Sequence, residues 1–91
     1  MNKIYKDDIH RIAIKNGRDG IIEKYTEETQ ELLDGLLAND IPNVKEEVVD
    51  VMIMCEQIIK LYGFSEDSLK EIKEYKIKRT KERLGIKDEK S

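Results

Sequence analysis

The chain has few of the residues that build disulfides, zinc centres or nucleophilic active sites. Cys55 is its only cysteine and His10 its only histidine. A lone cysteine permits neither an intrachain disulfide nor a cysteine-rich zinc site, and it suits a reducing compartment, so we expect a cytoplasmic protein. No Ser/His/Asp or Cys/His set can be assembled, and the absence of a glycine-rich phosphate loop excludes a P-loop enzyme.

Long apolar runs and an excess of basic residues are also missing. No run approaches the roughly 18 apolar residues of a membrane span, and no segment reads as a signal peptide. The net charge of −3 argues against a dedicated nucleic-acid binder. We therefore expect neither a membrane nor a nucleic acid as partner, although a bound cation would let an acidic protein hold a nucleotide.

Charged residues are abundant, at 41% of the 91 residues against 38% hydrophobic. This balance fits helices that each keep one face in water. The length predicts a single domain over residues 1–86, with a frayed tail at residues 87–91. Because so short a chain buries only a modest fraction of its surface, we expect a second copy to complete the core.

Apolar residues recur at helical spacing, and no stretch alternates convincingly as a strand would. The sequence predicts an all-α bundle of a short N-terminal helix and three main helices, completed by oligomerisation. The expected elements are a helix over about residues 4–15, a turn at 16–20, helices over about 21–37 and 43–62, and a last helix from Ser65 to Gly85. The apolar stripe expected on the 21–37 helix is Ile22, Tyr25, Thr29, Leu32, Leu33 and Leu36.

Two acidic pairs stand out on neighbouring predicted helices. Glu28 and Glu31 are three residues apart, and Glu47 and Asp50 repeat that spacing on the next helix. The second pair lies at the start of and within the apolar run of residues 48–55, on the side of Met54, Ile58 and Leu61. Buried carboxylates are strongly disfavoured unless they are paired or bound to metal.

A short loop between these helices makes them antiparallel neighbours, so all four carboxylates could converge. Oxygen donors without histidine or thiolate suit a hard cation, Mg²⁺ or its substitute Mn²⁺. The competing interpretation is a solvated acidic face, which is common for Glu28 and Glu31 alone in so charged a chain. The apparently buried surroundings of Glu47 and Asp50 favour the metal site.

A basic stripe follows on the last helix. It begins apolar at Leu69 and Ile72 and becomes basic at Lys76, Arg79 and Arg83. Its apolar half is expected to pack on the core while its basic half reaches toward the acids. Cations beside a carboxylate-bound metal describe a phosphate site, since metal and cations share the ligand's negative charge. The alternative is ordinary surface charge.

The two-part acidic motif resembles a known family. The segment from Glu27 to Glu31, separated by fifteen residues from Glu47-Val48-Val49-Asp50, is similar to the E-E-x-x-E … E-x-x-D signature of the MazG-like nucleotide pyrophosphohydrolases. The likeness covers about residues 20–84 and is strongest to short single-domain bacterial and phage members. The chain lacks the tryptophan that some relatives carry before the first motif.

The resemblance implies an all-α dimer or tetramer that cleaves nucleoside triphosphates to monophosphate and pyrophosphate with Mg²⁺. By position, the metal ligands correspond to Glu28, Glu31, Glu47 and Asp50. Lys76, Arg79 and Arg83 correspond to phosphate-binding positions, although many members carry an asparagine where Arg79 lies. Glu27 and Glu28 are the candidate general bases that would accept the proton of the attacking water.

Two other functions compete with this one. A non-catalytic helical dimerisation or regulatory module would show no Mg²⁺ effect on stability and no pyrophosphate release. A nucleotide binder that has lost catalysis would be protected by nucleotide with Mg²⁺ but would not turn it over. The complete set of four acids favours the enzyme.

Overall fold

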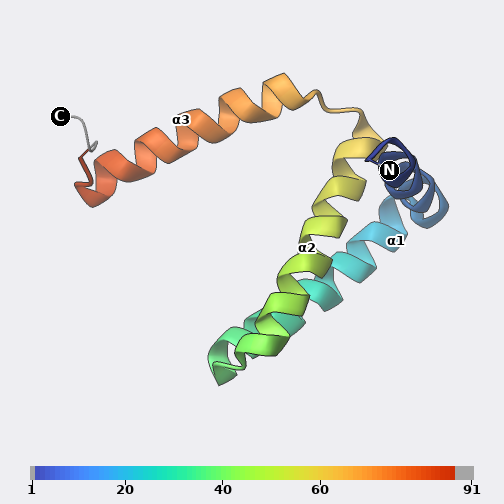
Figure 1. The fold of residues 1–91 in the computed structure, drawn as a ribbon, viewed down its shortest axis with the longest axis horizontal. Helices are drawn as coiled ribbons and strands as arrows, with labels where there is room; N and C mark the ends of the chain where they lie inside the picture. The colour runs from blue at the N-terminus through green and yellow to red at the C-terminus, as the bar shows by residue number, and fades with distance from the viewer. Residues whose placement is uncertain (1, 88–91) are drawn as a thin grey trace.

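Three helices account for nearly all of the described chain, in which no strand occurs. The computed structural model describes the backbone of residues 2–87 and the side chains of residues 8–87. The helices are α1 (Asn2–Ala38), α2 (Ile41–Tyr62) and α3 (Glu66–Leu84), shown in Figure 1. The all-α prediction is therefore confirmed over this range. Of the tail expected to fray, residues 88–91 lie outside the described residues.

The predicted ends of α2 and α3 follow from their capping residues. Gly63 ends α2 in the left-handed conformation (φ 67°), and its N–H donates to the carbonyl of Ile59. The hydroxyl of Ser65 caps α3 by accepting from the N–H of Ser68 at 3.1 Å. α2 begins earlier than predicted, at Ile41, because the Asp40 side chain caps it. None of the described helices is both long and apolar enough to cross a bilayer.

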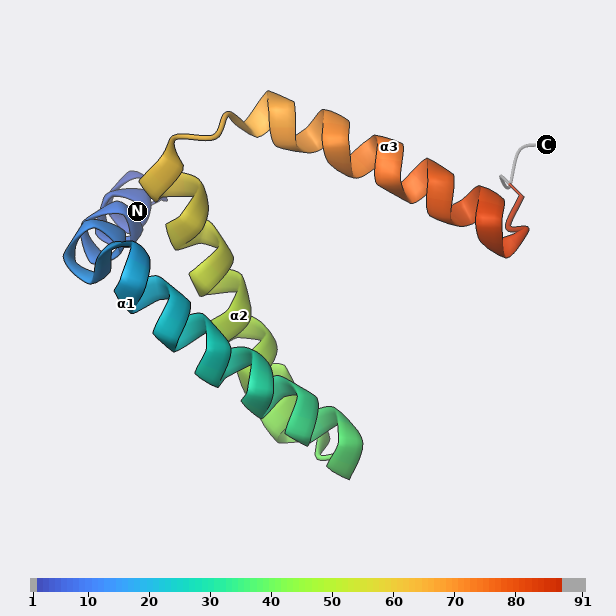
Figure 2. The ribbon, with the colours of Figure 1, turned by 180° about the vertical axis from the view of Figure 1, so that it is seen from behind.

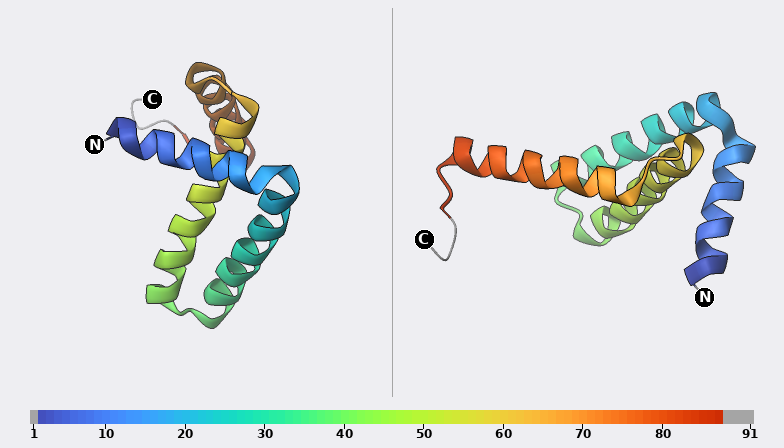
Figure 3. Two further views of the ribbon diagram at one scale, coloured as in Figure 1. Left: turned by 90° about the vertical axis from the view of Figure 1, so that its right-hand side faces the viewer. Right: turned by 90° about the horizontal axis from the view of Figure 1, so that it is seen from above.

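The expected short first helix and five-residue turn are not seen as separate elements. α1 runs on from Asn2, broken only at Gly17, where the backbone adopts φ 68° and ψ 177°. This conformation is essentially restricted to glycine, so a single residue redirects the chain. Figure 3 shows the result: the N-terminal arm, residues 2–16, lies at a steep angle to the rest of α1.

Beyond Gly17, α1 and α2 form an antiparallel hairpin, residues 18–62, joined at Asn39 and Asp40 (Figure 2). Its apolar core is small. Ala13 from the arm, Ile21 from α1 and Met54 from α2 are buried together, with Ile58 and Leu61 packed against them. Among the described side chains, no large one is fully buried. One chain alone therefore buries little apolar surface.

The prediction that the apolar stripe is the buried face of α1 is wrong. Ile22, Leu33 and Leu36 are each about half exposed, at 49%, 49% and 57%. The buried line along α1 instead runs through Ile21, Glu28 and Gly35, seven residues apart. The hairpin has thus closed on its acidic side and left most of the stripe exposed, with Thr29 and Leu32 partly buried.

The α2 run of residues 48–55 is likewise less buried than its composition predicts. Met54 is buried, but Val49 and Met52 are 51% and 57% exposed, and Cys55 is exposed. A helix that is apolar all round is normally covered on every side. Here the side opposite α1 has no cover among the described residues.

α3 stands apart from the hairpin. It projects away from the end of α2 and packs against neither α1 nor α2 (Figures 1 and 2). The radius of gyration is 16.2 Å, whereas a compact chain of this length is expected at about 12 Å. The expectation that Leu69 and Ile72 pack on the core is wrong for a single chain: Ile72 is 50% exposed.

Candidate metal centre

The two acidic pairs meet between α1 and α2. Oxygens of Glu28, Glu47 and Asp50 lie within 4.8 Å of one another. Glu31, one turn after Glu28, lies close enough to Glu47 to share a hydrogen bond when one of the two is protonated. The antiparallel hairpin therefore brings together the four acids that the sequence singled out. We call Glu28, Glu31, Glu47 and Asp50 the acid cluster.

Burial divides the acid cluster. Glu28 and Glu47 are 7% and 8% exposed, while Asp50 opens toward solvent. One carboxylate oxygen each of Glu28 and Glu47, Oε2, is buried without any hydrogen-bond partner. Such oxygens are costly because desolvation of a charged group has to be offset by a donor or a cation. The site thus has two buried carboxylate oxygens that receive no donor from the described residues.

The electrostatics of Glu47 reflect this crowding. Burial raises the pKa of Glu47 to about 7, and the neighbouring carboxyls of Glu31 and Glu28 contribute further. The raised pKa means that Glu47 tends to hold a proton. A divalent cation would replace that proton, because it neutralises the same negative charge. Carboxylate oxygens at this spacing fit a hard, oxygen-liganded ion. The residues present therefore fit Mg²⁺ or Mn²⁺.

Lys24 is a member of the site that the sequence analysis missed. Its ammonium lies 3.3 Å from Oε1 of Glu28, one turn earlier on α1. This hydrogen bond, with the charge of Glu27, raises the pKa of Lys24. The signal was present as a Lys–Glu pair four residues apart. Such pairs are so common on solvated helices that spacing alone could not single this one out.

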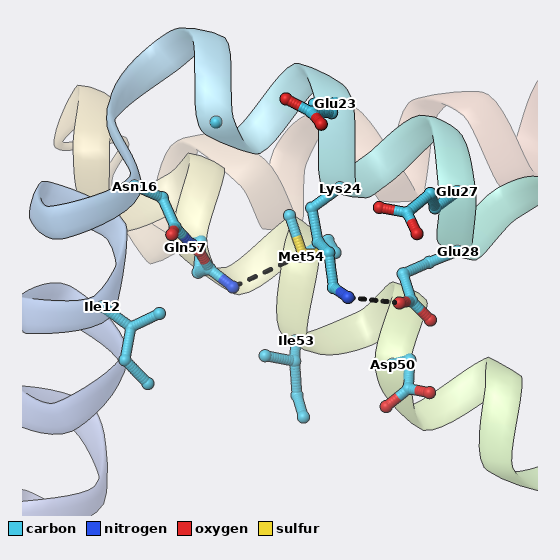
Figure 4. Close-up of a pocket in the computed structure, with 11 residues that line it drawn as sticks. Ile12, Asn16, Glu23, Lys24, Glu27, Glu28, Asp50, Ile53, Met54 and Gln57 are labelled. Atoms are coloured by element: carbon cyan, nitrogen blue, oxygen red, sulfur yellow. Dashed lines mark hydrogen bonds and ion pairs between the residues drawn. The ribbon is translucent and has the colours of Figure 1, made fainter.

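A cavity of about 340 Å³ opens beside the acid cluster. Figure 4 shows Glu27, Glu28 and Asp50 at one end of it and Asn16 and Gln57 at the other. Glu27 is exposed along this wall and has no hydrogen-bond partner among the described residues. It is therefore available to accept a proton, whereas Glu28 is engaged by Lys24.

The expected phosphate-binding residues are elsewhere. Lys76, Arg79 and Arg83 lie on α3, which does not approach the hairpin of its own chain. The Arg79 guanidinium lies 5.6 Å from the centre of the Tyr75 ring, a cation–π distance. The structure thus joins the four acids but does not join them to the basic stripe within one chain.

Comparison with known proteins identifies no relative: no family model, curated protein or solved structure matches this chain.

Proposed function

We propose that this protein is a Mg²⁺-dependent nucleoside triphosphate pyrophosphohydrolase of the MazG-like type. The observation that carries the proposal is the pair of buried Oε2 atoms of Glu28 and Glu47 that have no hydrogen-bond partner among the described residues, beside Asp50, with oxygens of the three residues within 4.8 Å of one another. Acids in a solvated face would turn to water, whereas these two are held away from it. Mg²⁺ is the cation that such a donor set most readily serves in phosphate chemistry.

The reaction adds water across the bond between the α- and β-phosphorus atoms. The water oxygen bonds to the α-phosphorus, the bridging oxygen leaves with pyrophosphate, and the products are nucleoside monophosphate and pyrophosphate. A divalent cation held by the acid cluster would supply charge neutralisation and lower the pKa of a bound water. Glu27, exposed on the cavity wall, accepts the proton. Lys24 offers a positive charge at the same end of the cavity.

We further propose that the active unit is a homo-oligomer in which α3 of one copy serves the acid cluster of another. Three observations support this. α3 contacts neither other helix of its chain, and both helices of the hairpin expose large apolar residues. Residues 76–83 also carry five Lys or Arg against one Glu, which complements the acidic hairpin. Lys76, Arg79 and Arg83 would then bind the departing pyrophosphate in trans.

The experiment that tests the reaction is a pyrophosphate-release assay over the common ribo- and deoxynucleoside triphosphates, with Mg²⁺, Mn²⁺ or EDTA. At least one nucleotide should be cleaved with either metal and none with EDTA. Asp50→Asn and Glu47→Gln should each lower the rate by roughly 100-fold or more. Glu46→Gln, one residue away but exposed, is the matched control and should keep the wild-type rate. A wild-type rate in Asp50→Asn would refute the assignment.

A second candidate is the helical interaction module, which the projecting, partly apolar α3 favours. Its signature would be self-association without pyrophosphate release and without any stabilisation by Mg²⁺.

A further inference from the structure

The end of the cavity remote from the acids carries uncharged amides. Asn16 Nδ2 donates to Gln57 Oε1 at 2.9 Å, joining the N-terminal arm to α2. Ile53 and Met54 line the wall between this pair and Asp50, and Ile12 faces them from the arm (Figure 4). The cavity thus passes from a charged end, past apolar walls, to an end that can hydrogen-bond without charge.

The kink in α1 creates this amide end. Because Gly17 redirects the arm, the Asn16 side chain comes within hydrogen-bond distance of Gln57 on α2. Gly20 leaves room for it: a Cβ at that position would lie 3.3 Å from Cβ of Asn16. Two glycines therefore set the position of one amide.

The pair retains hydrogen-bonding capacity. Gln57 is 3% exposed, and the acceptor of its amide is the sulfur of Met54 at 3.4 Å, which is a weak one. The Asn16 carbonyl oxygen accepts no hydrogen bond from the described residues. The hydrogen bond between Asn16 and Gln57 would by itself be enough to hold the arm against α2. Both residues line the cavity, and each keeps donor or acceptor positions that no described residue uses.

We propose that Asn16 and Gln57 form the nucleobase-reading end of the site, a reading that rests on the proposed function for its phosphate end. Amide side chains present a donor and an acceptor side by side, and the edges of nucleobases offer the same pattern in complement. Apolar side chains such as Ile53 and Met54 suit the faces of a flat ring. The mutual hydrogen bond holds both amides in place before a ligand arrives, which lowers the ordering cost of binding.

A purely structural pair would make a different prediction. If Asn16 and Gln57 only pinned the arm to α2, altering Asn16 would weaken all ligands equally through the shape of the cavity. A base-reading pair instead changes the relative affinity of nucleotides that differ only in the base. A triphosphate without any base should be insensitive to it.

The test compares wild type with Asn16→Asp by calorimetry in Mg²⁺. The ligands are the α,β-methylene analogues of CTP and UTP, in which carbon replaces the oxygen whose bond hydrolysis breaks, and inorganic tripolyphosphate. Aspartate can only accept, and it favours the amino group of cytosine, so the ratio of the two nucleotide dissociation constants should move about tenfold toward the CTP analogue. Lys15→Gln is the control, because it changes the net charge equally at the adjacent position, outside this cavity.

Tripolyphosphate affinity should change no more in Asn16→Asp than in Lys15→Gln. An unchanged ratio between the nucleotides, an equal loss for all three ligands, or no nucleotide binding by the wild type would overturn the base-reading role. If the ratio moves as expected but natural nucleotides are not cleaved, the proposed reaction fails and base reading stands. If cleavage occurs and the ratio does not move, the reverse holds.

Discussion

Glu47 is the residue at which the demands of folding and of binding conflict most. Its carboxyl is nearly buried, one oxygen has no partner, and Glu31 and Glu28 lie beside it. In the absence of a cation, protonation of Glu47 removes its charge at the least cost in free energy and lets Glu47 donate a hydrogen bond to a neighbouring carboxylate. This is why its pKa is raised to about 7.

The raised pKa makes the stability of the metal-free protein depend on pH. Between pH 4.5 and about 7 the folded state holds a proton that the unfolded state has released. The free energy of unfolding should therefore fall as the pH rises through this window, and the contribution should be lost above it. Urea unfolding in EDTA from pH 4 to 8 measures the effect.

Glu47→Gln removes the titrating group, so its stability should fall less over the same window. Glu46→Gln should retain the wild-type slope, because Glu46 is exposed. Parallel curves for wild type and Glu47→Gln would show that Glu47 does not hold the proton.

At the scale of one residue, the sequence predicted the acids well and their surroundings poorly. The spacing of Glu28/Glu31 and Glu47/Asp50, with a short loop between, sufficed to predict their convergence, because antiparallel neighbours have few other arrangements. Lys24 and Gln57 could not be found in this way. A lysine one turn before a glutamate and a glutamine in an apolar helix are both common. The place of Lys24 depends on the burial of Glu28 between the helices, and the contact of Gln57 with Asn16 depends on the angle at which α1 bends.

The kink in α1 is the feature of secondary structure on which the cavity depends. The sequence predicted a five-residue turn at residues 16–20, but the structure needs only Gly17. Helical hydrogen bonding resumes at once because only one residue leaves the helical region. The facing of the α1 stripe was mispredicted for a related reason: periodicity defines an apolar face but not the partner that covers it.

Gly17→Asn should therefore destabilise the fold by about 1–3 kcal/mol, because φ 68° with ψ 177° is closed to side chains. No atom lies within 4 Å of the Cβ position, so the effect would come from the backbone and not from crowding. Thermal unfolding should show a fall in Tm of several degrees.

Gly63→Asn is the matched comparison. Gly63 also has a positive φ, but its ψ of 33° puts it in the left-handed region that asparagine tolerates. The Gly63→Asn variant should lose clearly less stability than the Gly17→Asn variant. Equal losses at the two positions would mean that Gly17 is not strained in the way described.

For the whole molecule, the main feature is the apolar and charged surface that a single chain leaves exposed. α3 is detached, the hairpin shows apolar residues on both helices, and the acid cluster lacks the cations of the basic stripe. The sequence predicted that a chain of 91 residues would need a second copy. It could not show that α3 would stand apart from the hairpin, because that depends on the direction in which the chain leaves Gly63.

Sharing of α3 predicts complementation between two inactive variants. Asp50→Asn keeps an intact α3, and the double variant Lys76→Ala/Arg79→Ala keeps an intact acid cluster. Each alone should be nearly inactive. Refolded together in equal amounts, random dimers should recover about a quarter of the wild-type activity, since half are mixed and one of their two sites is complete. No recovery in a mixture shown to contain mixed oligomers would place the cations in cis or outside the site.

The most direct test of the account is a calorimetric titration of the protein with Mn²⁺ at pH 6.5, in two buffers of different ionisation enthalpy. We expect saturable binding to wild type and to Glu46→Gln, accompanied by release of part of a proton to the buffer as the cation displaces it from Glu47. Binding should be strongly weakened in Glu47→Gln and Asp50→Asn. Absence of saturable binding to wild type, or equal binding by all four proteins, would contradict it.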